Sequence, residues 1–258
     1  MRMEKAIRFE RDVHTALWGH EEWLVSAHPS APSRTADAKG QTLRVICPEF
    51  PLLIKKICAN QRLSVQVHPN DATAKTVGGE AKTEMWCVLA AGPIFAGFKP
   101  GVTKADVERA VGDGTFEDLL VRFDAKPGEC YFIPGGLVHA IGEGSSVYEV
   151  QQSSDTTFRL YDWGRVGADG KPRRLHVKEG LAAMDITLPP PVPSDSVKCP
   201  YFEFVKLATR NAELEARNRW RVVYVPSADD SFLLSPDSEA EIPPGAWVTV
   251  LPLKGANG

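Results

Sequence analysis

The chain has 258 residues, of which 43% are hydrophobic and 24% are charged, and its formal net charge is −3. This is enough chain for one large β domain or two small ones with a buried core. The small negative charge gives no reason to expect nucleic acid or an anionic membrane as a partner. No apolar run approaches the roughly 20 residues that a membrane-spanning helix needs. The start of the chain, Met1 to Lys5, leads into no apolar stretch of the kind that signal peptides carry.

The cysteines are scattered along the chain and none is part of a Cys-x-x-Cys pair. They are Cys47, Cys58, Cys87, Cys130 and Cys199. An odd number at irregular spacing does not indicate a disulfide framework, so we interpret each cysteine as a small buried hydrophobic residue. Together with the absence of a leader, this pattern favours a reducing, cytoplasmic compartment.

Apolar residues alternate with period two through most of the chain, which is typical of half-buried strands. Gly, Pro and Asp separate the runs, and many short strands with frequent turns predict a sandwich or a barrel. In the first two thirds of the chain the predicted strands are residues 43–47, 52–58, 63–68, 84–90, 94–98, 129–134, 146–152 and 156–163.

Helical spacing interrupts this pattern in residues 103–121, where two short helices are predicted around a Gly-Asp-Gly break. Thr103 is the expected N-cap of the first helix, with Asp106 three residues further on. Another helix is predicted at residues 177–184, and a Pro-rich, semi-rigid connector follows at residues 188–193. Beyond the connector, strands are expected at residues 201–207, 220–225 and 246–251.

Two blocks of sequence carry side chains that can bind a metal ion. Residues two apart on a strand share a face, so Ser64, Gln66 and His68 are expected on one face. Glu84 begins the next strand, and His139 follows a tight Pro-Gly-Gly turn that can aim it back at the other ligands. Two imidazoles, a carboxylate and an amide oxygen suit Zn²⁺, Mn²⁺, Fe²⁺ or Co²⁺. We therefore predict one divalent metal site.

Other polar side chains near these blocks indicate a substrate. Lys82 shares a face with Glu84 and can reach a substrate oxygen, and Glu149 lies on the strand at residues 146–152. Arg159 stands among polar residues, and a guanidinium group binds phosphate or carboxylate in a bidentate manner. The sequence therefore predicts an anionic substrate beside the metal.

These residues carry a resemblance to known proteins. The run Gly128-x5-Pro134-x-Gly136-x2-His139 fits the second cupin motif, and His68 with Glu84 represents the first motif with a longer gap. Over roughly residues 15–180 the chain also resembles the type I mannose-6-phosphate isomerases, particularly their compact bacterial branch. The segments that carry this likeness are residues 50–55, 63–71, 82–89, 131–140 and 149–165.

The resemblance implies a role for each candidate side chain. The positions that bind zinc in that family match Gln66, His68, Glu84 and His139. The positions that take part in catalysis in that family match Arg159, Lys82, Glu149 and Asp155. The positions implied in substrate binding match Ser64, Lys82 and Arg159, with the serine contacting phosphate. One Zn²⁺ per chain is thus expected, and the residues alone do not decide which carboxylate is the base.

The implied fold is mainly β: a cupin, or jelly-roll β-barrel, over residues 1–190, with residues 103–121 as a short helical insertion. Residues 191–258 are expected to form a smaller C-terminal β unit that could belong to a second barrel. Compared with longer members of the family, the helical insertion is reduced and the stretch before residue 43 is abbreviated. These differences concern the rim of the pocket.

The implied activity is a metal-dependent isomerisation of mannose 6-phosphate and fructose 6-phosphate through a cis-enediol. Two alternatives stay open: a cupin that binds a sugar phosphate without turnover, and another cupin metalloenzyme such as an oxygenase. The expected partner is a small-molecule sugar phosphate, with no nucleic acid and no membrane. The oligomeric state is left open.

Overall fold

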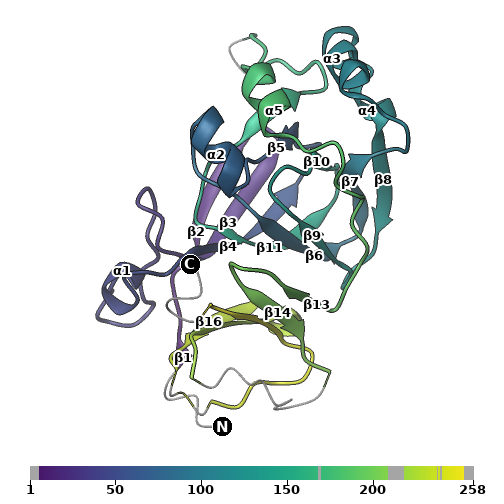
Figure 1. Ribbon diagram of the computed structural model, residues 1–258. Coiled ribbons are helices and arrows are strands. Elements are labelled where there is room, and N and C mark those ends of the chain that lie inside the picture. The colour runs from purple at the N-terminus through teal and green to yellow at the C-terminus, as the bar shows by residue number, and fades with distance from the viewer. Residues whose placement is uncertain (1–5, 168–169, 209–217, 237, 239, 253–258) are drawn as a thin grey trace. The chain divides into compact units, whose positions relative to one another are not determined.

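The computed structural model describes residues 6–167, 170–208, 218–236, 238 and 240–252. Met1 to Lys5, on which the prediction about a signal peptide rests, lie outside these residues. The chain divides into two compact units (Figure 1). Unit 1 comprises residues 1–13, 22–55 and 194–258, and unit 2 comprises residues 14–21 and 56–193. Among the described residues, no helix has both the length and the apolar character needed to cross a membrane.

Unit 1 is built on a six-stranded antiparallel sheet with the order β1-β16-β15-β17-β14-β13. The first strand, β1 (Ala6–Ile7), pairs with β16 and so joins the sheet formed by the C-terminal third of the chain. The other strands are β13 (Ser196–Lys198), β14 (Glu203–Lys206), β15 (Arg221–Val225), β16 (Asp230–Leu234) and β17 (Trp247–Val250). Two short helices, α1 (Leu43–Ile46) and η1 (Pro226–Ala228), also belong to this unit.

Unit 2 contains a five-stranded antiparallel sheet with the order β12-β5-β10-β7-β8. Its strands are β5 (Val65–Val67), β7 (Gly92–Phe98), β8 (Leu120–Ala125), β10 (His139–Ile141) and β12 (Phe158–Tyr161). Three strands of another antiparallel sheet follow the order β11-β6-β9. They are β6 (Glu84–Ala90), β9 (Cys130–Ile133) and β11 (Ser146–Gln152). Chain continuity links the units through β2 (Asp12–Ala16), β3 (Gly19–Ser26) and β4 (Leu52–Ala59).

The two sheets of unit 2 share one hydrophobic core. Trp86 and Val88 of β6 pack in the same buried cluster as Ile94 and Ala96 of β7 and Ile141 of β10. Because side chains alternate across a strand, this cluster shows which residues of each strand face inward. The inward face of β6 therefore includes Glu84, Trp86 and Val88.

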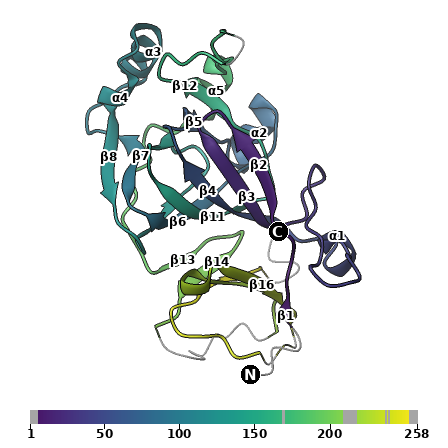
Figure 2. The ribbon, with the colours of Figure 1, turned by 180° about the vertical axis from the view of Figure 1, so that it is seen from behind.

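The outward face of the five-stranded sheet is covered by helices. Val65, Phe95 and Ala140 pack in a second cluster with Val107 and Phe116, which lie on the inserted helices. These helices are α3 (Lys104–Asp113) and α4 (Phe116–Leu119), and α5 (Val177–Ala183) packs along β12. Figure 2 shows α3 and α4 above the edge strand β8. The inserted helices thus cover the side of the sheet that faces away from Gln66.

Two helices begin at side-chain caps that the sequence encodes locally. The hydroxyl of Thr103 accepts a hydrogen bond from the N–H of Asp106, whose carboxylate accepts one from the N–H of Thr103. The same reciprocal arrangement joins Asn70 and Thr73 at the start of α2 (Asp71–Val77). Capping of this kind satisfies amide groups that have no partner within the helix.

The prediction of a mainly β fold with antiparallel sheets is confirmed, and so are the two short helices within residues 103–121. Among the described residues the strands form separate sheets, and the pairing does not close into one barrel. The strand predicted at residues 43–47 is wrong, because residues 43–46 form α1 with Leu43 buried. Its Leu-x-Val-Ile pattern fits one turn of helix as well as a short strand, so periodicity could not separate the two. Helix α2 was not predicted.

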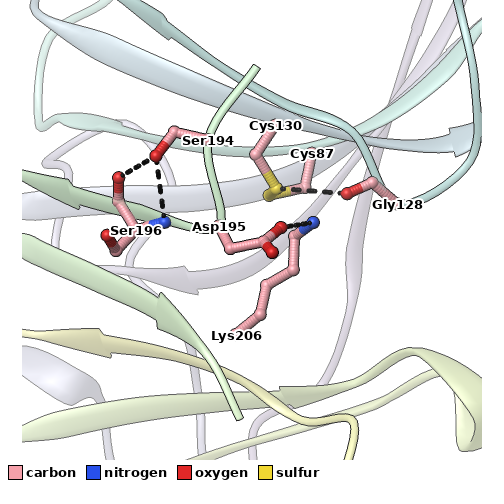
Figure 3. Close-up of a disulfide and its surroundings, with 7 residues drawn as sticks. All are labelled: Cys87, Gly128, Cys130, Ser194, Asp195, Ser196 and Lys206. Atoms are coloured by element: carbon pink, nitrogen blue, oxygen red, sulfur yellow. Dashed lines mark hydrogen bonds and ion pairs between the residues drawn. A yellow bond between two sulfur atoms is a disulfide. The ribbon is translucent and has the colours of Figure 1, made fainter. Parts of the chain in front are cut away.

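The interpretation of every cysteine as a small buried hydrophobic residue is wrong for two of them. Cys87 on β6 and Cys130 on β9 stand directly opposite each other, and their sulfur atoms are bonded (Figure 3). Both residues are buried, and Cys130 Sγ also lies 3.8 Å from the carbonyl oxygen of Gly128. The cysteines are 43 residues apart in the sequence, so only the strand pairing reveals the bond. Cys47, Cys58 and Cys199 form no disulfide with the described residues; Cys47 is buried, as expected, whereas Cys58 and Cys199 are partly exposed.

Breaking this disulfide should lower the stability of the protein by about 2–4 kcal/mol, because the bond restricts a long loop in the unfolded chain. Urea unfolding of the oxidised wild type should be compared with the Cys87→Ala/Cys130→Ala variant and with wild type in excess reductant. Both treatments should lower the midpoint. Equal midpoints for all three samples would contradict a bond between these residues.

Candidate metal centre

The rings of His68 and His139 are held by backbone carbonyl groups. His68 Nδ1 lies 2.8 Å from the carbonyl oxygen of Thr156, and His139 Nδ1 lies 2.9 Å from that of Leu137. Since a carbonyl only accepts, each Nδ1 carries the proton and each Nε2 presents a lone pair. This is the arrangement that fixes the tautomer of metal-binding histidines.

Glu84 lies between the two Nε2 atoms. Its Oε2 is 3.4 Å from His68 Nε2, its Oε1 is 3.5 Å from His139 Nε2, and the carboxylate is fully buried. Neither oxygen accepts a well-aligned hydrogen bond from the described residues. Lys82 Nζ is 2.9 Å from Glu84 Oε2 and 3.1 Å from His68 Nε2, and it brings positive charge to this position. A buried carboxylate needs a cation beside it.

The strand register explains why residues far apart in the sequence meet here. Gln66 on β5 stands directly opposite His139 on β10 and Arg159 on β12, so these three side chains form one row across the sheet. In the other sheet, Gln151 on β11 stands opposite Glu84 on β6. Directly opposed residues share a face. The two rows therefore both lie on inward faces.

Gln66 is the fourth predicted ligand. Its Nε2 lies 3.4 Å from His139 Nε2, and its Oε1 lies 3.3 Å from the hydroxyl of Ser64, which can donate to it. Rotation of the amide by a half turn would exchange the two atoms and direct the oxygen toward His139. Ser64 thus lies beside Gln66, as the sequence predicted.

This donor set fits a divalent metal. One ligand atom each from His68, Glu84 and His139 lies within 4.8 Å of the others, and all three residues are buried. Burial lowers the pKa of His139 to about 4, with the charge of Lys82 acting in the same direction. The imidazole is therefore neutral near pH 7, which is the form that binds metal. Nitrogen lone pairs and carboxylate oxygen are ligands that zinc and its neighbours in the first transition series accept.

The two candidate bases differ in their surroundings. Glu149 is buried on the inward face of β11, and its Oε1 accepts a hydrogen bond of 2.9 Å from Trp86 Nε1. It also influences the pKa of His139 through its charge. Asp155, in contrast, is exposed. The structure therefore brings Glu149 close to the cluster and leaves Asp155 in solvent.

Arg159 belongs to a group of arginines around Asp162. The carboxylate of Asp162 accepts hydrogen bonds from Arg165 and from Arg173, at 2.5–2.7 Å. Burial alone would raise the pKa of Asp162, but these hydrogen bonds outweigh it and lower the pKa. Arg159 donates to the carbonyl of Arg174 at 2.8 Å, and burial followed by the charge of Arg173 lowers its pKa.

This group carries more positive charge than Asp162 can neutralise. Arg159 Nε and Arg165 Nε and Nη1 are buried and have no hydrogen-bond acceptor among the described residues. Guanidinium groups with unused donors of this kind are able to bind an anion. The sequence singled out Arg159 but missed Arg165 and Arg173. The density of arginines on both sides of Asp162, between Arg159 and Arg173, is the sequence feature that could have indicated them.

The fold and the site define a class: an antiparallel, mainly β protein with a buried His–Glu–His cluster and a cationic group beside it. No family model matches the chain. An alignment that covers 70% of the chain is 36% identical to the mannose-6-phosphate isomerase of Streptococcus mutans. Another that covers 64% of the chain is 42% identical to a mannose-6-phosphate isomerase of Bacillus subtilis. The chain is thus similar in sequence to these mannose-6-phosphate isomerases along about two thirds of its own length.

These matches cover 62% and 58% of the two relatives, so the chain spans about three fifths of the length of the curated relatives it matches. Solved structures share its fold. The crystal structure of the mannose 6-phosphate isomerase from Bacillus subtilis superposes with a TM-score of 0.75 at 21% identity, covering 96% of this chain and 100% of that one. A mannose 6-phosphate isomerase bound with zinc and yttrium superposes with a TM-score of 0.61 at 15% identity, covering 96% and 94%.

The stability of the metal-free protein should depend on His139 below neutral pH. Its folded pKa of about 4 lies below the ordinary value of 6.5, so between these pH values the unfolded chain binds a proton that the folded protein does not. Stability should therefore fall by roughly 3 kcal/mol as the pH drops through this window. Urea unfolding between pH 4 and 7 tests this, with His139→Gln as the comparison. Identical pH profiles for both proteins would contradict the assignment.

Proposed function

We propose that the chain is a zinc-dependent aldose–ketose isomerase that interconverts mannose 6-phosphate and fructose 6-phosphate. The observation that carries this proposal is a shared row of side chains: Gln66 stands between His139 of the metal cluster and Arg159 of the arginine group. A substrate with a carbonyl end and an anionic end has a complementary group for each part. The homology to mannose-6-phosphate isomerases supports the same conclusion.

The proposed ligands of the zinc ion are Gln66, His68, Glu84 and His139. When bound there, the metal would supply a Lewis acid that stabilises negative charge developing on a substrate oxygen. We favour zinc because two neutral imidazoles and one carboxylate are typical zinc ligands. The carbonyl groups of Thr156 and Leu137 keep both Nε2 lone pairs in the orientation that binding needs.

The isomerisation moves a proton between two neighbouring carbons through a cis-enediol, and a base must accept it. We propose Glu149 rather than Asp155, because Glu149 is buried near His139 while Asp155 is exposed. The hydrogen bond from Trp86 Nε1 holds the Glu149 carboxylate in one orientation. Lys82, buried beside Glu84, is proposed to handle the proton of the substrate hydroxyl.

The phosphate is proposed to bind at the arginine group. Arg159 and Arg165 offer buried donors, and a phosphate dianion accepts such charge-assisted hydrogen bonds strongly. Ser64 is proposed as a further contact, because its hydroxyl lies 3.3 Å from Oε1 of Gln66, which belongs to the same row as Arg159. The cationic group would then orient the sugar so that its carbonyl end reaches Glu84 and the histidines.

Further parts of the proposal concern the whole protein. We propose that it acts in the cytoplasm on a small-molecule substrate, with residues 1–190 as the catalytic domain and residues 191–258 as the C-terminal β unit. In that compartment Cys87 and Cys130 are expected to be held as thiols, because disulfides are rare in the cytosol. Titration of free thiols in freshly lysed cells tests this, and an intact Cys87–Cys130 bond there would contradict the cytoplasmic proposal.

The first test is a coupled isomerase assay with mannose 6-phosphate on zinc-loaded protein. Turnover should disappear after chelation and return when Zn²⁺ is added, because the cluster needs its metal to stabilise the developing charge. A chelated sample treated with Mg²⁺ serves as the control. Zinc-loaded protein that turns over neither mannose 6-phosphate nor fructose 6-phosphate would contradict the proposal.

Replacing Arg159 separates substrate chemistry from metal binding. Arg159→Ala should lower kcat/KM by about 10- to 100-fold, mainly through a higher KM, because the phosphate loses a charge-assisted hydrogen bond, while the zinc content stays at the wild-type level. Arg122→Ala is the matched control, because Arg122 is an exposed arginine that pairs with Asp124. If kcat/KM of Arg159→Ala equals that of the control, Arg159 has no part in substrate binding or turnover.

A further inference from the structure

Gln151 is a buried amide beside the metal cluster with a hydrogen-bond pattern that no role above explains. It is fully buried on β11, directly opposite Glu84. Its Nε2 donates to the carbonyl oxygens of Gln152 at 2.9 Å and Ser154 at 2.7 Å. Its Oε1 is buried and has no hydrogen-bond donor among the described residues. Both amide hydrogens are thus committed to the segment that follows the strand.

That segment has no strand or helix of its own. Residues 154–157 have no regular hydrogen-bond ladder, so side chains hold the backbone in place. The hydroxyl of Ser154 accepts from the N–H of Thr156 at 3.2 Å and donates to the carbonyl of Glu80 at 3.1 Å. The hydroxyl of Thr156 accepts from the N–H of Glu80 at 2.9 Å.

The end of this chain of contacts is a proposed metal ligand. The carbonyl oxygen of Thr156 is the group that receives Nδ1–H of His68, at 2.8 Å. The position of that oxygen depends on Ser154, and Ser154 is fixed on its other side by Gln151. A substitution of Gln151 is therefore expected to affect the ring of His68 indirectly, through Ser154 and Thr156.

We propose that Gln151 is a positioning residue for the metal centre, which holds the Ser154–Thr156 segment so that His68 keeps its Nδ1–H tautomer and presents Nε2 to the metal. This inference rests on the metal site proposed above. The two donor contacts support it, because both amide hydrogens of Gln151 are used to hold this segment, while its Oε1 makes no hydrogen bond with the described residues.

The test measures zinc affinity and the tautomer of His68 in the same variants. Gln151→Met keeps the length of the side chain and removes both donors. Zinc affinity, measured by competition with a chromophoric chelator, should fall about 10- to 100-fold, as for other groups that orient a metal-binding histidine. In the metal-free protein, long-range ¹H–¹⁵N spectra of the histidine rings should show that His68 loses its single Nδ1–H tautomer.

Two further variants make the outcome decisive. Ser154→Ala removes the next contact in the chain, so it should weaken zinc binding in the same direction and provides a second variant if Gln151→Met does not fold. Ser153→Ala is the matched control, because its hydroxyl makes no hydrogen bond with the described residues. It should bind zinc like wild type.

The results distinguish a wrong role for Gln151 from a wrong metal centre. If Gln151→Met and Ser154→Ala unfold at lower temperature but keep wild-type zinc affinity and the His68 tautomer, Gln151 is a structural residue and the inference is wrong. If wild type itself binds no zinc, the metal centre is wrong. The tautomer of His68 in metal-free Gln151→Met then still decides whether Gln151 controls that ring.

Discussion

Burial of the Glu84 carboxylate is the constraint on which the rest of the site depends. A carboxylate removed from water is costly unless a cation or donors compensate it. The Lys82 ammonium at 2.9 Å from Glu84 meets part of this demand. The two imidazole Nε2 atoms at 3.4 and 3.5 Å do not, because each presents a lone pair to the carboxylate rather than a proton. Because these contacts do not compensate the buried carboxylate fully, the site favours the binding of a divalent cation.

The fold supplies this arrangement by dividing each inward face into an apolar part and a polar end. Along β6 the inward residues change from Val88 and Trp86 in the core to Glu84 at the end. Loops meet closely around that end. A Cβ on Gly135 would lie 2.8 Å from the carbonyl oxygen of Pro69, and one on Gly79 would lie 2.6 Å from the side chain of Thr156. Only glycine allows these approaches, so the loops next to His68 are fixed by sterics as well as by hydrogen bonds.

The sequence predicts those parts of the molecule that depend on local pattern. The alternation of β6 and β11 predicts both strands with their observed bounds, and the turn residues around His139 predict a ligand. The disulfide, the row through Gln66 and the role of Gln151 depend instead on which strands pair and in what register. Register is set by tertiary packing, and a single sequence does not reveal it. The arginines around Asp162 are a different case, because Arg165 and Arg173 lie only three and eleven residues from the carboxylate that they share.

The spacing of strands also limits what the proposed site can accept. His139, Gln66 and Arg159 lie on three neighbouring strands, so the metal cluster and the arginine group are about two strand spacings, or roughly 10 Å, apart at the backbone. A ligand that uses both must place its carbonyl and its anionic group at opposite ends of a chain of several carbons. A short hydroxy acid could satisfy only one of them. The separation between the two groups, rather than either group alone, therefore favours a hexose phosphate as the substrate.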